Sequence, residues 1–213
     1  MDWFKNALIF CGLLGLSIPA WAEESRLELR LIAVDSGPGV FFSRDEAVSN
    51  PGDDTFTYGS GGMFGVRIAG DRLSITYLKG SHRLTSSTSD NEANLDEFSY
   101  SGECSSELGT LDHTWYSEKP QARSQWTFSL SAGVLSLTCT NKRLSTDESF
   151  DYSARTPVLG FDLTYIFSGS FFVGFIYEGG LGGSTVDYQQ SSYQRQYTAT
   201  TAYTGGFMAG LVF

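Results

Sequence analysis

The chain has 213 residues, enough for one domain, and a formal net charge of -10 at pH 7. This acidity argues against nucleic-acid binding, which needs a basic surface. The 24 glycines, 5 prolines and 15% aromatic residues argue against disorder and favour strands joined by tight turns.

The first 22 residues have the order of a signal peptide. Lys5 gives a weakly basic start, an apolar run follows over Ala7–Leu16, and Ala20-Trp21-Ala22 supplies a small-x-small cleavage site. The apolar run is shorter than the ~20 residues that a membrane helix needs. We therefore predict cleavage after Ala22, export to the periplasm, and a mature domain over residues 23–213.

From residue 26 onward, apolar side chains alternate with small or polar ones, which is the period of a β-strand. The sequence predicts eight strands, the fourth of which is the weakest because His113 interrupts its apolar face. The predicted strands cover residues 26–34, 56–69, 73–77, 108–117, 125–139, 159–167, 171–178 and 197–213.

Two hairpins are the clearest local predictions. A two-residue turn at Gly70-Asp71 would set Ile68 opposite Leu73, and a three-residue turn over Ser168–Ser170 would pair Phe167 with Phe171. In both hairpins the apolar faces of the two strands then coincide, so the pairing register agrees with the pattern.

The predicted connections alternate in length along the chain. Short turns fall at residues 70–71, 118–124 and 168–170, and long loops at 35–55, 81–107, 140–156 and 182–196. Short turns at one end and long loops at the other, on an even number of antiparallel strands, are the pattern of bacterial outer-membrane barrels. The long loops are then expected on the extracellular side.

Large aromatic side chains gather on one face of the predicted strands, and Gly, Ser, Thr and a few charged residues on the other. The interior of an eight-stranded barrel is just wide enough for side chains. We expect the small and polar face inside and the aromatic face toward lipid, with Tyr and Trp near the edges. The alternative is a soluble barrel with the aromatic face inside, because period two does not say which face is buried.

The last predicted strand ends on an aromatic residue, Phe213, which shares one face with Tyr203, Phe207 and Leu211. This ending is similar to the C-terminal signal that the assembly machinery of bacterial outer-membrane barrels reads. Over residues 26–213 the chain resembles the small eight-stranded group that includes the OmpA-like and OmpX-like barrels. The resemblance implies an up-and-down transmembrane barrel, a monomer in the bacterial cell outer membrane among its lipids and lipopolysaccharide.

Two cysteines follow the signal peptide, Cys104 and Cys139. If Ser117 pairs with Trp126 across the turn between them, the same register sets the two cysteines directly opposite each other, on the inward face. Opposed side chains are close to disulfide range, and the periplasm is oxidising. We predict a disulfide that clamps the second long loop; the alternative is two free thiols.

Five charged residues fall on the inward face: Glu28, Arg30, Arg67, Asp162 and Glu178. Buried charges must pair, so we expect a structural ion-pair network that plugs the barrel. The alternative is a narrow path for ions.

The first two long loops are acidic. Their carboxylates could hold divalent cations, but the spacing fits no EF-hand, and solvated charge is the simpler interpretation. We predict no cofactor and no metal site.

An enzyme of the lipid A-modifying kind would need a histidine, a hydroxyl and an acid within reach of one another. The sequence holds two histidines, His82 and His113, and neither sits in a His-x-Ser arrangement. We therefore predict no catalytic residues. The expected function is a non-enzymatic barrel that anchors surface loops, for envelope integrity or adhesion, with a narrow channel and a lipid A-modifying enzyme as the alternatives.

Overall fold

The computed structural model describes residues 27–35, 37–44, 53–89, 100–118, 124–143, 149–168, 170–181, 185–190 and 197–213. These residues form one antiparallel sheet, and no helix among them is long and apolar enough to cross a membrane. The strands are β1 (Glu28–Asp35), β2 (Gly39–Arg44), β3 (Asp53–Ala69), β4 (Leu73–Ser89), β5 (Tyr100–Tyr116), β6 (Gln125–Arg143), β7 (Ser149–Phe167), β8 (Phe171–Gly180), β9 (Thr185–Gln190) and β10 (Tyr197–Val212).

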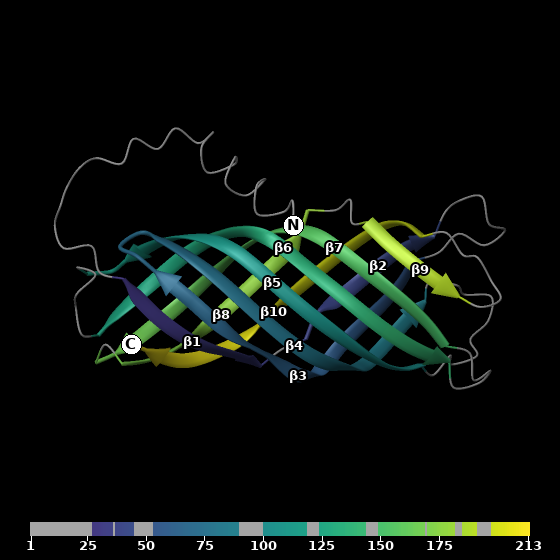
Figure 1. The fold of residues 1–213 in the computed structure, drawn as a ribbon, viewed down its shortest axis with the longest axis horizontal. Helices are drawn as coiled ribbons and strands as arrows, with labels where there is room; N and C mark the ends of the chain where they lie inside the picture. Colours follow the sequence, from purple (N-terminus) through teal and green to yellow (C-terminus); the bar gives the residue numbers. More distant parts are fainter. Residues whose placement is uncertain are drawn as a thin grey trace.

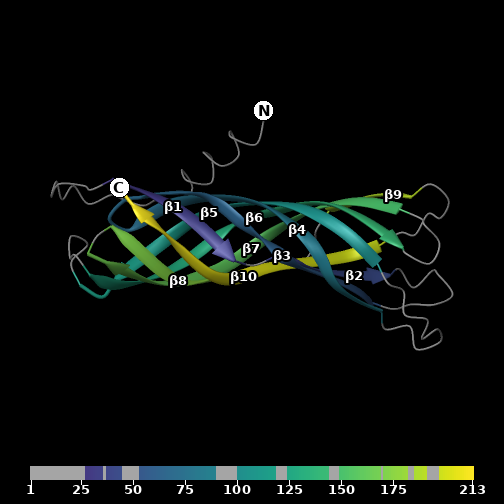
Figure 2. The same cartoon turned by 90° about the horizontal axis from the view of Figure 1, so that it is seen from below.

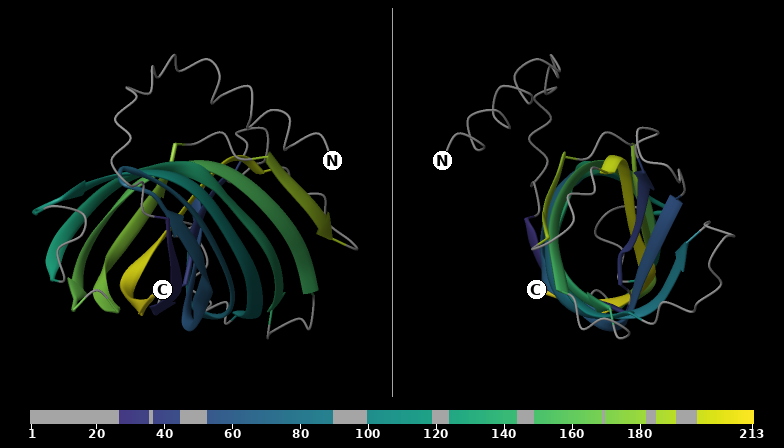
Figure 3. Two further views of the ribbon diagram at one scale, coloured as in Figure 1. Left: turned by 60° about the vertical axis from the view of Figure 1, so that its left-hand side comes forward. Right: turned by 90° about the vertical axis from the view of Figure 1, so that its right-hand side faces the viewer.

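The sheet closes into a barrel with eight positions around the wall (Figure 1; Figure 3, right). β1 and β2 share one position, because both lie between β10 and β3. β8 and β9 share another, because both pair with β7. β10 pairs with β8 and with β1, which closes the ring. The predicted eight-stranded antiparallel up-and-down barrel is confirmed.

The strands are longer than the sequence predicts. Residues 39–44, 81–89, 100–107, 140–143, 149–156 and 185–190 were expected in long loops, but the structure shows them as strand. In residues 100–107 and 140–143 the alternation is weak because polar side chains occur on both faces of the strands. The signal peptide, and the parts of the predicted loops at 45–52, 90–99, 144–148 and 191–196, lie outside the described residues.

The hairpin registers agree with two of three predictions. Phe167 pairs with Phe171, and Ser117 donates its backbone N–H to the carbonyl of Trp126 at 2.9 Å. At the first turn, Ile68 pairs with Ile75 rather than with Leu73, so that prediction is wrong by two residues. A shift of two leaves every side chain on the same face, so the apolar pattern fits both registers equally.

The aromatic face of the strands points outward. Phe64, Phe128, Phe161 and Phe175 have exposed fractions of 67%, 39%, 39% and 38%. The soluble inverse, in which these rings form the core, is therefore wrong. We name the outward apolar surface the apolar band. It includes Leu29, Leu31, Phe64, Val66, Ile68, Leu73, Ile75, Tyr77, Leu111, Trp115, Trp126, Phe128, Leu130, Leu159, Phe161, Leu163, Phe167, Phe171, Val173, Phe175, Tyr177, Phe207, Leu211 and Phe213.

Neighbouring rings of the band contact one another across the strands. Trp126 meets Tyr165 with ring centroids 5.0 Å apart, and Trp115 stacks on Phe128 at 5.8 Å. Phe167 stacks on Phe171 at 5.8 Å across the β7–β8 turn. Such pairs add to the stability of a sheet beyond simple area burial. Trp115, Trp126 and Tyr165 thus lie near the turn end of the band, where interfacial aromatic residues are common.

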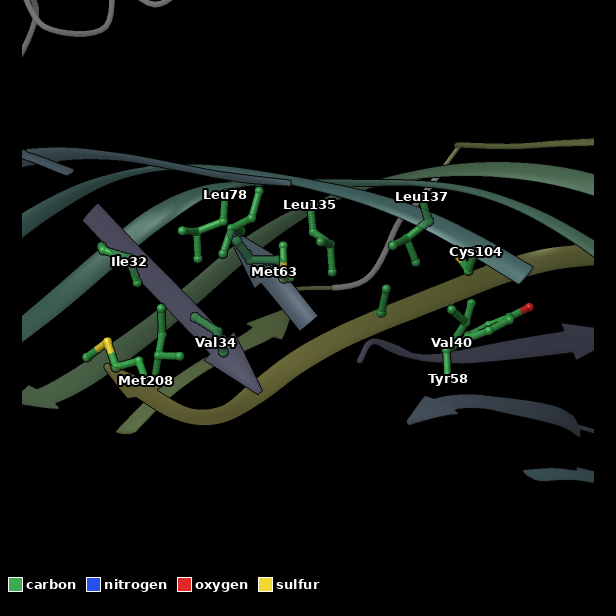
Figure 4. Close-up of a cluster of buried hydrophobic side chains, with 14 of the residues drawn as sticks. Ile32, Val34, Val40, Tyr58, Met63, Leu78, Cys104, Leu135, Leu137 and Met208 are labelled. Carbon is green, nitrogen blue, oxygen red and sulfur yellow. The ribbon is translucent and has the colours of Figure 1, made fainter. Parts of the chain in front are cut away.

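The interior is filled by side chains, and part of it is apolar rather than small and polar as the sequence suggested. Ile32, Val34, Met63, Leu78 and Leu135 point inward and are at most 4% exposed (Figure 4). These residues come from strands on different sides of the barrel, so they fill the lumen as a layer. Side chains of this size are needed because eight strands leave a cylinder too wide for glycine and serine alone.

The sheet continues well beyond the apolar band. On the outer face of β7, apolar residues end near Pro157, and Arg155, Ser153 and Asp151 follow. The apolar stretch of β7 rises by roughly 25 Å at the usual rise and tilt, about the height of the band in outer-membrane barrels. The remaining part of the strand adds about 20 Å. We name this part of the wall, over β4–β7, the extension; it lies at the end opposite to the C-terminus (Figure 2).

One extra residue interrupts the regular pairing of β3. β1 sets Val34 opposite Met63, whereas β2 sets Val40 opposite Phe56, so β3 is one residue longer over the same stretch. The pairing of β3 with β4 is also irregular here, and Gly61 has a φ of 135°, a backbone conformation that favours glycine. Below this bulge Met63 faces inward, and above it Tyr58 does.

Candidate functional site

An ion cluster occupies the middle of the barrel interior, at the level of the apolar band. Arg67 on β3 reaches across the lumen to Asp162 on β7, with Nη2 and Oδ2 2.8 Å apart. Its Nε lies 3.4 Å from Oδ2 of Asp112 on β5. The three side chains are between 0% and 3% exposed. One guanidinium therefore serves two carboxylates in a site closed to water.

Hydroxyl groups complete the hydrogen bonds of both aspartates. Ser74, Thr76 and Thr110 donate to Asp112 at 3.2, 2.5 and 2.6 Å. Ser129 and Thr164 donate to Asp162 at 3.3 and 3.1 Å. Strands β4 to β7 thus each present inward hydroxyls at this level, and buried carboxylates need such donors.

Glu178 on β8 is the third buried carboxylate near this cluster. Ser131 donates to its Oε1 at 2.6 Å, but within the described residues its Oε2 accepts no hydrogen bond. Gly160 makes room for the carboxyl group, because a Cβ there would lie 2.3 Å from Oε2.

The five predicted interior charges face inward, but they do not form one network. Glu28 and Arg30 pair with each other at 2.9 Å, near the start of β1. Arg67 and Asp162 belong to the central cluster, and Glu178 lies beside it. Sequence reasoning missed Asp112, although it shares the inward face of β5 with Thr110 and Thr114. That alternation was the available signal.

A second set of cross-lumen contacts lies at the level of the extension. The hydroxyl of Tyr58 on β3 lies 2.7 Å from that of Tyr152 on β7 and donates to Oδ1 of Asn141 on β6 at 3.0 Å. All three side chains are at most 2% exposed. Side chains therefore cross the lumen at two levels: the Arg67–Asp162 ion pair at the level of the apolar band, and the Tyr58–Tyr152 contact at the level of the extension.

The predicted disulfide between Cys104 and Cys139 is confirmed. The two residues are direct partners of β5 and β6, and both are buried in the lumen of the extension. His82 is the partner of Cys104 on β4, and Tyr152 is the partner of Cys139 on β7. The disulfide thus joins two strands at a level where the outer face is polar.

The two histidines lie on opposite faces of the wall. Nε2 of His82 is 2.7 Å from the hydroxyl of Ser106 inside the barrel, and its Nδ1 has no hydrogen-bond partner in the described part of the chain. This pair lacks the acid that would orient a catalytic histidine. His113 lies on the outer face, with its ring 4.4 Å from that of Trp115.

The described acidic residues of the second predicted loop belong to the wall of the barrel. Glu107 pairs with Lys79 at 2.7 Å, and Glu103 lies 3.9 Å from Arg83, all on the outer face. Over the described residues, no group of three or more His, Cys, Asp or Glu is placed to hold a metal ion.

The predicted C-terminal signal residues share the outer face of β10. Phe207, Leu211 and Phe213 are 77%, 47% and 66% exposed, and Tyr203 is partly exposed. The backbone of Phe213 exchanges two hydrogen bonds with Leu29 of β1, at 2.9 and 3.3 Å. Phe207, Leu211 and Phe213 therefore lie beside the pairing of β1 with β10, whereas Tyr203 lies farther along β10, opposite Gly39 of β2.

No family model and no curated protein matches the chain. Several solved structures are similar to it, among them the following three. The N-terminal β-barrel domain of OprF from Pseudomonas aeruginosa is 16% identical, with a TM-score of 0.42 over 89% of this chain and 100% of that one. Ail, the attachment invasion locus protein of Yersinia pestis, is 9% identical, with a TM-score of 0.41 over 87% and 98%. The outer membrane protease OmpT from Escherichia coli is 7% identical, with a TM-score of 0.42 over 90% and 97%.

Proposed function

We propose that this chain is a non-enzymatic barrel of the bacterial outer membrane that holds the extension and the connections above it at the cell surface. The role would be envelope integrity or contact with other surfaces, such as adhesion. The observation that carries the proposal is the change in the outer face of one continuous wall. It is apolar and aromatic in the band, and polar in the extension.

The apolar band is the surface that would contact lipid. Exposed aromatic and aliphatic side chains on adjacent strands would form a large apolar patch in water, which soluble monomers rarely expose. In a bilayer the same surface is solvated by hydrocarbon, and the closed sheet leaves no backbone edge to satisfy. Outer-membrane lipids, and lipopolysaccharide around the extension, are the expected surroundings.

The outer face of the extension supports a location outside the membrane. Lys79 and Glu107 begin it on β4 and β5, and Arg83 and Glu103 follow four residues farther along the same strands. Charged side chains at these positions are costly in hydrocarbon but ordinary in the polar layer above it. The Phe207, Leu211 and Phe213 face of β10 is the surface we propose for recognition by the assembly machinery.

The interior supports an anchor rather than a channel or an enzyme. The central ion cluster, the apolar layer with Met63 and Leu78, and the Tyr58–Tyr152 contact fill successive levels of the lumen. The enzyme alternative has a histidine beside a hydroxyl at His82, but both groups are buried in the wall interior, away from any substrate in the membrane.

The orientation can be tested by cysteine labelling in intact cells. Ser81→Cys places an outward thiol in the extension, and Asp71→Cys places one in the turn between β3 and β4. A membrane-impermeant maleimide should label the first variant in intact cells and the second only after lysis. Both variants should also migrate differently in unheated and heated samples on a denaturing gel, as folded barrels do.

Labelling of Asp71→Cys from outside, or equal labelling of the two sites in intact cells, would contradict the proposed orientation. A soluble periplasmic or extracellular fraction that contains the folded protein would contradict the membrane location itself.

A further inference from the structure

The charges in the middle of the barrel do not balance. Within the described residues, the electrostatic neighbours of Glu178 are Asp112, Asp162 and Arg67. Three buried carboxylates thus share one guanidinium. The direct partners of Glu178 on the two neighbouring strands are neutral: Gly160 on β7 and Thr204 on β10. Asp162 is the charged inward residue that these two strands contribute at this level.

Arg67 is already committed to the two aspartates. It bonds Asp162 through Nη2 and lies beside Asp112 through Nε, and Nε also donates to Thr76 at 2.7 Å. Five hydroxyl donors serve the same two carboxylates. Glu178 has one donor, Ser131, and its second oxygen faces Gly160 without a hydrogen bond.

An ionised Glu178 would be a buried negative charge beside two others, with half of its carboxylate unsolvated. Burying such a charge without a partner costs far more than burying a neutral polar group that lacks one hydrogen bond. The neutral acid therefore fits this position, and the ionised form does not.

We propose that Glu178 is a proton-binding site in the interior of the barrel: it stays protonated when the protein folds and makes the stability of the barrel fall as the pH rises. The inference does not rest on the cellular location, since it concerns the folded barrel in a lipid bilayer or a detergent micelle alike.

The expected sign follows from proton linkage. Above about pH 4.3 a glutamate in the unfolded chain has released its proton, whereas Glu178 in the barrel keeps it. Folding then takes up one proton, so each unit of pH rise lowers the folding equilibrium constant by up to tenfold. The loss stops where the folded protein also releases the proton.

The test compares urea unfolding of the wild-type protein and Glu178→Gln in the same detergent micelles, from about pH 5 to pH 9. The glutamine keeps the shape and can accept from Ser131, but it cannot ionise. The wild-type folding constant should fall relative to that of Glu178→Gln across this range. Glu28→Gln is the matched control, because Glu28 pairs with Arg30 elsewhere in the lumen. The folding constant of Glu28→Gln should decrease with pH as that of the wild type does.

Infrared spectroscopy gives a direct readout if Glu178→Gln folds poorly. Wild-type protein with isotope-labelled glutamate should show the carbonyl band of a protonated carboxylic acid at neutral pH. Absence of that band, or a fall with pH that is equally steep in Glu178→Gln, would overturn the proposal.

Discussion

At the scale of single residues, Arg67 is the group on which the interior most depends. It is the cation between two buried carboxylates that come from different strands, β5 and β7. Breaking a buried ion pair by removing one partner is strongly destabilising, because the remaining charge has lost its solvation and its partner. An exposed pair on the same protein has no such penalty.

Replacing Arg67 by alanine should therefore lower the free energy of unfolding by about 3–5 kcal/mol. Arg83→Ala is the control, because Arg83 is 79% exposed and lies 3.9 Å from Glu103; its expected effect is below about 1 kcal/mol. Urea titration of the refolded variants in detergent measures both values. Equal effects of the two substitutions would mean that the central cluster does not stabilise the barrel.

At the scale of elements, the same strand has two different outer environments. Leu130 and Thr138 both lie on the outer face of β6, the first in the apolar band and the second in the extension. The strand itself continues through both with unbroken pairing to β5 and β7. A charged side chain therefore tests the surroundings at each level without changing the sheet.

Leu130→Arg should destabilise the barrel in lipid vesicles by about 2–4 kcal/mol, whereas Thr138→Arg should cost less than about 1 kcal/mol. Unfolding titrations in vesicles measure the two effects. A large loss for Thr138→Arg would place the band higher on the wall than we infer.

The disulfide acts on a single hairpin. Cys104 and Cys139 are 35 residues apart in the sequence and join β5 to β6 inside the extension. Replacing both by serine removes a constraint on the unfolded chain, with an expected loss of about 2–4 kcal/mol. The paired strands should still form, so thermal unfolding should shift to lower temperature with the gel-mobility difference intact. Identical unfolding of the serine variant and the oxidised wild type would contradict this.

The sequence predicted the elements wherever the two faces of a strand differ. Residues 159–167 alternate large apolar and small or polar side chains, so their strand and its orientation were evident. In the extension, His82 inside and Arg83 outside are both polar, so period two carries no contrast there. The ends of the strands could therefore not be predicted from the sequence.

The candidate site was predictable to the same extent. The alternation of side chains along each strand predicted which charged residues face inward, and the register of the β5–β6 turn predicted the disulfide. Which charges meet could not be predicted, because Arg67 and Asp162 face each other across the lumen rather than along a hairpin. Asp112 was missed because its strand was the least certain, with His113 interrupting the apolar outer face.

At the scale of the whole molecule, the barrel has a lumen filled with side chains and the apolar band on its outer face. Its described interior contains charged, apolar and tyrosine levels in succession, and each contains contacts between strands on opposite sides of the wall. With an interior filled in this way, we expect no hydrated path of the width that porins have.

Purified protein in a planar bilayer should accordingly show no sustained conductance. The physical reason is that an ion would have to displace Arg67 from its two carboxylates and then pass an apolar layer. Electrical recording at fixed voltage, with the folded state verified on the same sample by gel mobility, measures this. A stable open level of reproducible size would favour the channel alternative over the anchor.

The surplus residue in β3 decides on which side of the wall a tyrosine stands. With regular spacing above Met63, Tyr58 would belong to the outer surface, and Tyr152 would lose the hydroxyl that meets it. Straightening the bulge at the present chain length would therefore turn Tyr58 outward, whereas deleting one residue of Gly59–Gly62 would place Tyr58 four residues from Met63 and keep it on the inner face. At the present length of the chain, the bulge in β3 is therefore what brings the hydroxyl of Tyr58 to that of Tyr152 inside the barrel.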